Sequence, residues 1–297
     1  MRTTSEAHKT VLGVIGGSGF YRIDALSGVE EVSVKTPFGP PSDQIVTGRL
    51  GDVGVAFLPR HGAGHRLAPH EVPQRANIWA FASLGVRQVI SISAVGSLRE
   101  EIAPLHIVIP DQIIDRTRRP STFFEGGIVG HIGFDTPFCP TLSRHLAGSA
   151  EGVGVSVHRR GTLVVIDGPA FSTRAESELY RDWGADIIGM TAAPEAKLAR
   201  EAGMCYATLA CVTDYDTWHA TEEKVSVELI LANLGRNVDN ARRAVLAAAA
   251  SLPEWQSCTC RLAPKDAVVT PVDIVPEETK ARLGPIFDRM TEAGAGS

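Results

Sequence analysis

The sequence lacks the features that direct a protein to a membrane or onto nucleic acid. Its N-terminal stretch, MRTTSEAHKT, is polar, and the apolar run that follows, VLGVIGG, is far too short for a signal-peptide core or a membrane span. Neither charge dominates: 29 Lys and Arg against 34 Asp and Glu give a formal net charge of −5. This excludes a generally basic, nucleic-acid-coating surface but leaves room for a local anion pocket. We expect a cytoplasmic protein that binds no membrane and no nucleic acid.

Cysteines are also few, and no metal-ligand pattern is visible. Five cysteines, an odd number in a chain of 297 residues, favour free thiols. A disulfide between Cys258 and Cys260 would be strained, and a metal site there would need further ligands that the tail does not offer. The spacing of three histidines is not a zinc pattern either: His61, His65 and His70. No nucleophile elbow or Ser-His-Asp order stands out. We expect no metal and no organic cofactor.

What the chain does contain is an alternation of two kinds of segment, in a composition typical of globular proteins. Apolar, β-branched runs predict strands at 11–15, 53–58, 88–93, 107–109, 162–166, 186–190 and 206–213. Helical spacing predicts helices at 75–84, 174–183, 194–202 and 225–250. Strands that alternate with helices indicate an α/β fold with a central mixed, mainly parallel sheet flanked by helices.

The chain shows no internal repeat and no low-complexity linker before about residue 252. We expect a flexible N-terminus over 1–10, a single domain over 11–252, and a C-terminal appendage over 253–297 that packs on the same domain. In this appendage Pro, Glu and Lys become frequent, residues 276–290 could form a short helix, and the final TEAGAGS should fray.

Groups suited to an oxyanion follow four of the predicted strands. GGSGF, which contains Ser18, offers close backbone amides and a hydroxyl, although it lacks dinucleotide spacing and a P-loop lysine. Arg60, suited to bidentate oxyanion binding, and His61 follow the strand at 53–58. Ser93 and Thr191 follow two others. Each alone could be an ordinary turn, but strand ends meet at one edge of such a sheet. Their convergence predicts an anion site.

A fifth strand ends in Thr213-Asp214-Tyr215-Asp216, where two carboxylates can face one ligand. A purine leaving group gains negative charge as its glycosidic bond breaks, and a buried carboxylic acid near N7 can supply a proton. Burial would have to raise the pKa of that acid. The alternative, that these aspartates cap the next helix, suits Asp216 better than Asp214.

Several motifs of the sequence together resemble those of a known family. Residues 11–250 contain eight motifs: GVIGGSGFY, PRHG, ANIWAFASLGV, AVGSLREEI, IPDQIIDRT, IDGPAFSTRAES, WGADIIGMT and VTDYD. Together they resemble the methylthioadenosine phosphorylase branch of the trimeric purine nucleoside phosphorylases. The resemblance implies a homotrimer, or a dimer of trimers, whose neighbouring subunit completes each site. It also implies phosphorolysis of 5′-methylthioadenosine to adenine and 5-methylthioribose 1-phosphate, with inorganic phosphate as co-substrate.

The resemblance also implies a set of site residues. Asp214, His61 and Ser18 would be catalytic. Phosphate would be bound by Ser18, Arg60, His61, Ser93, Ala94 and Thr191. Phe171 and Ser172 would border the purine, Met190 would pack under the ribose, and Asp214 and Asp216 would bind the base. The apolar 5′ pocket would be formed by Val227, Ile230 and Leu231, with His131 of a neighbouring subunit.

Alternatives remain open. Similar enzymes that act on 6-oxopurines carry asparagine where this chain has Asp214, which favours adenine over a 6-oxopurine or methylthioinosine substrate. The chain departs from the family pattern at Ala170 and at Ala192-Ala193, and its tail after 252 matches poorly, so a 5′-halogenated adenosine is also possible. A hydrolase that uses water, and a nucleoside sensor without turnover, are further readings. The Arg60-His61 pair argues against the hydrolase.

Overall fold

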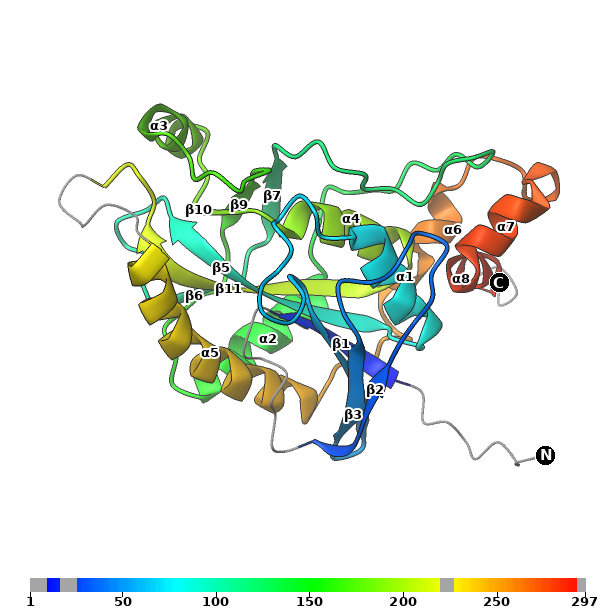
Figure 1. Cartoon of the computed structure of the whole chain (residues 1–297), viewed down its shortest axis with the longest axis horizontal. Coiled ribbons are helices and arrows are strands. Elements are labelled where there is room, and N and C mark those ends of the chain that lie inside the picture. The colour runs from blue at the N-terminus through cyan, green and yellow to red at the C-terminus, as the bar shows by residue number, and fades with distance from the viewer. Residues whose placement is uncertain (1–9, 17–25, 220–226, 293–297) are drawn as a thin grey trace.

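The computed structural model describes residues 10–16, 26–219 and 227–292 (Figure 1). Within them one eleven-stranded sheet crosses the molecule: β1 (Thr10–Gly16), β2 (Ser27–Val32), β3 (Ile45–Leu50), β4 (Val53–Pro59), β5 (Gln88–Ser97), β6 (Ile107–Val108), β7 (Gln112–Asp115), β8 (Val157–His158), β9 (Thr162–Val165), β10 (Ile187–Gly189) and β11 (Cys205–Tyr215). The main strand order is β2-β3-β4-β1-β5-β10-β9-β7, while β11 pairs with β5 and β6, and β6 with β8.

The sheet is mixed and mainly parallel. Six strand pairs are parallel, among them the central β4-β1-β5-β11 run, and four are antiparallel. The predicted α/β fold is therefore confirmed. The four strands that the sequence analysis missed are β2, β3, β7 and β8.

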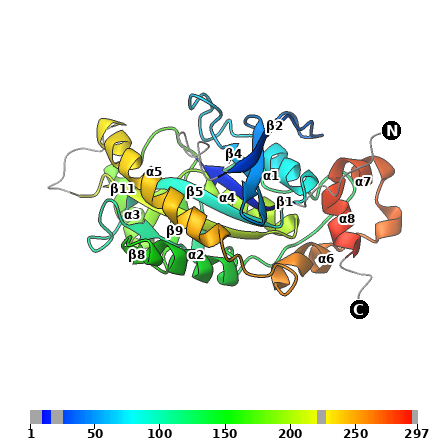
Figure 2. The ribbon, with the colours of Figure 1, turned by 90° about the horizontal axis from the view of Figure 1, so that it is seen from below.

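Helices cover both faces of the sheet: α1 (Gln74–Ser83), α2 (Pro140–Gly152), α3 (Arg174–Asp182), α4 (Ala192–Glu201) and α5 (Val227–Ala249). Alternate residues of β1 face opposite layers, as a strand requires: Ile15 packs with α1 and α4, whereas Leu12 and Val14 pack with α2 and α5. Figure 2 shows α5 lying across the strands with α2 beside it. No helix in the described ranges is long and apolar enough to cross a membrane.

The C-terminal segment forms η1 (Thr259–Leu262), α6 (Ala263–Ala267), η2 (Val272–Ile274), α7 (Glu277–Leu283) and α8 (Pro285–Glu292), gathered at one end of the molecule near α1 (Figure 1). Where one short helix was expected over 276–290, two form, because Gly284 has a positive φ of 50°. The buried guanidinium of Arg289 donates to the carbonyls of Ala82, Val86 and Ala202. These bonds fix α8 against the ends of α1 and α4. Residues 1–9 of the expected flexible N-terminus lie outside the described ranges.

Candidate active site

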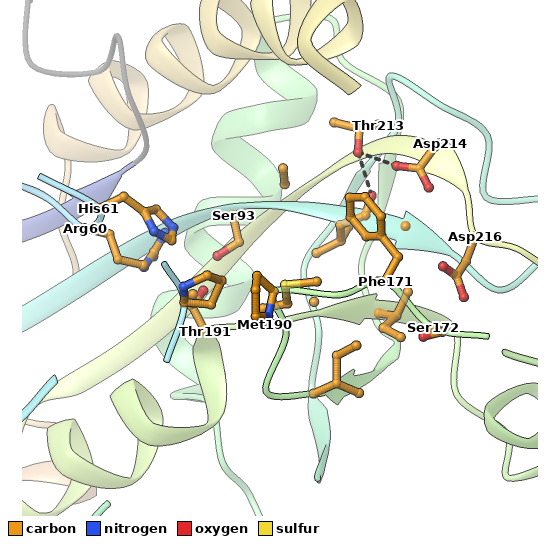
Figure 3. A pocket seen from close by; sticks show the side chains of 18 of the residues that line it. Arg60, His61, Ser93, Phe171, Ser172, Met190, Thr191, Thr213, Asp214 and Asp216 are labelled. Carbon is orange, nitrogen blue, oxygen red and sulfur yellow. Dashed lines mark hydrogen bonds between the residues drawn. The ribbon is translucent and has the colours of Figure 1, made fainter. Parts of the chain in front are cut away.

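A cavity of about 320 Å³ lies where β4, β5, β10 and β11 end. It brings together ten of the residues selected from the sequence: Arg60, His61, Ser93, Ala94, Phe171, Ser172, Met190, Thr191, Asp214 and Asp216. Figure 3 shows Arg60, His61 and Ser93 on one side and Asp214, Asp216 and Ser172 on the other, with Met190 between them. We call these two sides the anion end and the base end.

Of the other predicted residues, only His131 has a described side chain. Ser18 lies outside the described residues. Val227, Ile230 and Leu231 belong to α5, but their side chains are also outside the described part. His131 is absent from the cavity lining, and its backbone N–H donates to Ala267 O at 2.8 Å. Its predicted place in a neighbouring subunit's site stays a prediction.

At the anion end, Arg60 is already engaged by a buried carboxylate. Its Nε lies 2.5 Å from Glu195 Oε1, and one Nη lies 3.3 Å from Oε2, so Glu195 takes the bidentate position that sequence reasoning left for phosphate. The same carboxylate accepts hydrogen bonds from Ser91 and Tyr206 at 2.9 Å each. The ion pair is almost fully buried, and Glu195 holds the pKa of Arg60 above its usual value against the cost of burial. Glu195 therefore fixes the guanidinium of Arg60 at the cavity wall and offsets most of its positive charge.

His61 is held in one tautomer. Its Nδ1 lies 2.8 Å from Leu67 O, and a carbonyl can only accept, so Nδ1 carries the proton. Burial, followed by the nearby charge of Arg60, lowers the pKa of His61 to about 4. At neutral pH the ring is therefore uncharged, and Nε2 offers a lone pair.

Unpaired donors complete the anion end. Thr191 is the N-cap of α4, is buried, and makes no side-chain capping bond, so its hydroxyl and the first amides of α4 are available to a ligand. Ser93 Oγ is buried with no hydrogen-bond partner among the described residues. A buried hydroxyl without a partner is unfavourable, which indicates that a ligand satisfies it.

At the base end, no cation among the described residues acts on Asp214. Burial, and then the charge of Asp216, raises the pKa of Asp214 to about 6, although the hydroxyl of Thr213 acts in the opposite direction. Thr213 Oγ1 lies 2.7 Å from Asp214 Oδ2 and 3.2 Å from Val95 O, and both contacts are drawn in Figure 3. One hydroxyl proton cannot serve both acceptors fully. The shorter contact is the bond that Thr213 donates to Asp214 Oδ2.

A register shift in β11 sets the position of this pair of carboxylates. Val212 is opposite Val95 of β5 and Asp214 is opposite Gly96, so Thr213 is the extra residue of a β-bulge. A Cβ on Gly96 would lie 3.2 Å from Asp214 Oδ1, so the absence of a side chain there makes room for the carboxylate. Burial also raises the pKa of Asp216.

Between the two ends, the lining is largely apolar. Met190 follows β10, and Phe171 and Ser172 precede α3. Ser172 Oγ is buried without a partner among the described residues, whereas Phe171 is 46% exposed despite lining the cavity. The arrangement suits a planar ring between an apolar wall and polar edge contacts.

Sequence reasoning missed three contributors: Glu195, Thr213 as a partner of Asp214, and Gly96. Glu195 stands in the first turn of α4, where an acid is usually a solvated helix-end residue, and only the fold shows that it is fully buried. A buried Arg60 required a counter-charge, but sequence could not say that this lay 135 residues away.

Comparison with known proteins agrees with this geometry. A model of the phosphorylase superfamily matches residues 11–250. The S-methyl-5′-thioadenosine phosphorylase of Chloroflexus aurantiacus is 55% identical over 284 residues, covering 95% of this chain and 99% of that protein. The enzyme of the same name from Geobacter sulfurreducens is 52% identical over 275 residues, covering 92% and 96%.

Solved structures give the same result. A methylthioadenosine phosphorylase from an Antarctic soil metagenomic library superposes with a TM-score of 0.89 at 48% identity, over 94% of this chain and 99% of that one. The Schistosoma mansoni enzyme in complex with adenine has a TM-score of 0.78 at 38% identity, over 84% and 94%. The chain thus belongs to the phosphorylase superfamily, in its methylthioadenosine phosphorylase branch.

Proposed function

We propose that the protein cleaves 5′-methylthioadenosine with inorganic phosphate, giving adenine and 5-methylthioribose 1-phosphate. The observation that carries this proposal is the pairing of an anion end and a base end in one cavity (Figure 3). The relatives named above carry the same activity in their names.

The chemistry divides between the two ends. Phosphate binds as the dianion HPO₄²⁻, whose hydroxyl donates to His61 Nε2 while Ser93, Thr191 and the α4 amides donate to its other oxygens. The C1′–N9 bond breaks as a phosphate oxygen bonds to C1′, and the phosphate charge stabilises the cationic ribosyl centre. Asp214 gives its proton to the departing purine. As the new C1′–O bond forms, the phosphate proton passes to His61 Nε2. Solvent then takes that proton from His61 and returns one to Asp214, so the net reaction moves one proton from phosphate to adenine. The proposed mechanism uses no metal and no organic cofactor.

Substrate choice is part of the proposal. Protonated Asp214 donates to N7, and Asp216 accepts from the 6-amino group, a pattern that a 6-oxopurine does not match. A 5′-halogenated adenosine is the nearest alternative, because the 5′ pocket involves side chains outside the described residues.

The test measures base release from 5′-methylthioadenosine, 5′-chloro-5′-deoxyadenosine, adenosine and inosine, each with and without phosphate, compared as kcat/KM. We expect adenine only when phosphate is present, with 5′-methylthioadenosine leading. A higher kcat/KM for 5′-chloro-5′-deoxyadenosine would identify a halogenated adenosine as the preferred substrate instead. A preference for inosine would refute the proposal that Asp214 recognises adenine. Release of base without phosphate would refute the proposal that the anion end binds phosphate as the nucleophile.

We further propose a homotrimer, or a dimer of trimers, acting in the cytoplasm in purine salvage. The exposed ring of Phe171 at the cavity wall supports a subunit contact there, and five reduced thiols suit a reducing compartment. Light scattering on the purified protein checks the assembly: a monomeric mass with full activity would exclude a completing subunit.

A further inference from the structure

Four of the five cysteines meet far from the cavity, where the C-terminal segment joins the domain. The Sγ atoms of Cys139, Cys205, Cys258 and Cys260 all lie within 4.8 Å of one another. The sequence analysis found no further ligands for the Cys258-Cys260 pair, and the tail contains no other cysteine and no histidine. The fold supplies two from outside it: Cys139 is the N-cap of α2, and Cys205 opens β11.

The sulfur separations fit a shared ion better than a disulfide. Cys139 Sγ and Cys258 Sγ are 3.6 Å apart, and all five cysteines are free thiols. A disulfide requires about 2.05 Å between sulfurs. Four sulfurs placed tetrahedrally at about 2.3 Å from a zinc ion are separated by about 3.8 Å. The Cys139–Cys258 separation is close to this value, and the other sulfurs lie within 4.8 Å, so one tetrahedral ion could be reached by all four after small side-chain adjustments.

The surroundings are those of a preformed site. Backbone N–H groups hold three of the segments: Cys139 donates to Tyr206 O, Cys205 to Arg87 O, and Cys258 to Trp255 O, at 2.8–3.0 Å. Leu142 N–H donates to Cys139 Sγ at 3.5 Å, the kind of outer hydrogen bond that orients a thiolate ligand. Cys139, Cys205 and Cys260 are buried, and the partial exposure of Cys258 provides an entry path.

The donor set points to the metal. The cluster consists of four thiols, and no carboxylate or imidazole of the described residues belongs to it. Such a donor set favours a thiophilic ion in tetrahedral geometry. Four protein ligands leave no coordination position for a substrate, so such a site is structural.

We propose that Cys139, Cys205, Cys258 and Cys260 bind one zinc ion that fastens the C-terminal segment to α2 and β11. Binding releases the thiol protons and ties residues far apart in the chain, so the ion stabilises the folded state.

The test uses the full chain, purified under reducing conditions and dialysed after exposure to Zn²⁺. Elemental analysis should find about one zinc per chain. Cys258→Ser, at the least buried ligand, should lose the zinc, whereas Cys211→Ala, which changes a buried cysteine outside the cluster, should keep it. In the wild-type protein, Co²⁺ should produce the strong near-ultraviolet absorption of thiolate-to-metal charge transfer, a readout that needs no variant and no activity assay.

Three results would overturn the proposal. One is a wild-type protein that keeps no zinc after dialysis. The second is bound Co²⁺ without charge-transfer absorption, which places the ion on other ligands. The third is an intact mass that lacks thiol hydrogens although reductant is present, which identifies disulfides in place of a metal site.

Discussion

The two ends of the cavity handle charge in opposite ways. At the anion end the protein supplies its own partners: Glu195 for Arg60, and the Leu67 carbonyl for His61, whose pKa falls to about 4. At the base end Asp214 and Asp216 lie together, and burial raises the pKa of each. At the anion end, Arg60 and His61 therefore have their partners before a ligand binds. At the base end, the raised pKa values allow a carboxyl group to hold a proton. The comparison teaches that Arg60 and His61 have protein partners before a ligand binds, whereas the two aspartates have raised pKa values and no cation among the described residues as their partner.

Replacing the acid should have the largest effect. Asp214→Asn keeps the shape but removes the proton, so kcat/KM for 5′-methylthioadenosine should fall by about 10²- to 10⁴-fold. The new amide can donate to a 6-oxo group, so activity with inosine should fall less or rise. Asp52→Asn, at a fully exposed carboxylate, is the control. A small loss shared equally by both substrates would contradict the role of Asp214.

Breaking the ion pair should act mainly on stability. Glu195→Gln leaves the buried guanidinium of Arg60 without its counter-charge, which should lower the free energy of unfolding by about 3–5 kcal/mol. Glu125→Gln removes the partner of Arg75 in a half-exposed pair and should cost about 1 kcal/mol or less. Urea unfolding of both variants measures the difference, and equal losses would show that the anion end is not pre-neutralised by Glu195.

The two ends should also respond oppositely to pH. The pKa of Asp214 is raised to about 6 from 3.8, so its contribution to stability is present at low pH and is lost as pH rises through 6. The pKa of His61 is lowered to about 4 from 6.5, so its contribution is present above 6.5 and is lost as pH falls through 4. Each contribution is on the order of 3 kcal/mol.

Urea unfolding at pH 4 and at pH 6.5 separates these contributions. Stability should increase more steeply with pH in Asp214→Asn than in the wild type, and less steeply in His61→Asn. If the free energy of unfolding changes with pH equally in the wild type and in both variants, the pKa values of Asp214 and His61 are not shifted in opposite directions.

The smallest effect should come from Gly96→Ala. The new Cβ would stand 3.2 Å from Asp214 Oδ1 and 3.1 Å from Ile188, so the carboxylate must move by a few tenths of an ångström. KM for the nucleoside should rise on the order of tenfold, with little change in KM for phosphate. Gly148→Ala in α2, where a Cβ meets nothing within 4 Å, should leave both constants unchanged.

Sequence reasoning located the strands that are buried on both faces, because β1, β4, β5 and β11 read as continuous apolar runs. It missed β2, which is largely exposed and contains two glutamates, and β3, whose middle residues are half-buried. It also missed α2, since PTLSRHLAGSAEG has few apolar positions. Elements on the periphery bury too little surface to leave a clear pattern.

For the site, polar groups directly after buried strands were predictable because parallel strands end at one edge. The partners of those groups were not. Glu195 and the ligand set of Cys139, Cys205, Cys258 and Cys260 depend on segments that only tertiary packing brings together. Local patterns predicted which residues line the cavity, and the fold decides what each of them is bonded to.

The extra residue of β11 has a consequence for protein engineering. Side chains along a strand alternate between faces, so removing the bulge at Thr213 would exchange the faces of all residues after it. Replacing four residues of a related strand by Thr213-Asp214-Tyr215-Asp216 would therefore not be enough to transfer the proposed adenine recognition. The strand would also have to become one residue longer, so that Thr213 remains the extra residue of a bulge. On the proposed roles of Asp214 and Asp216, base preference depends on strand length as well as on residue identity.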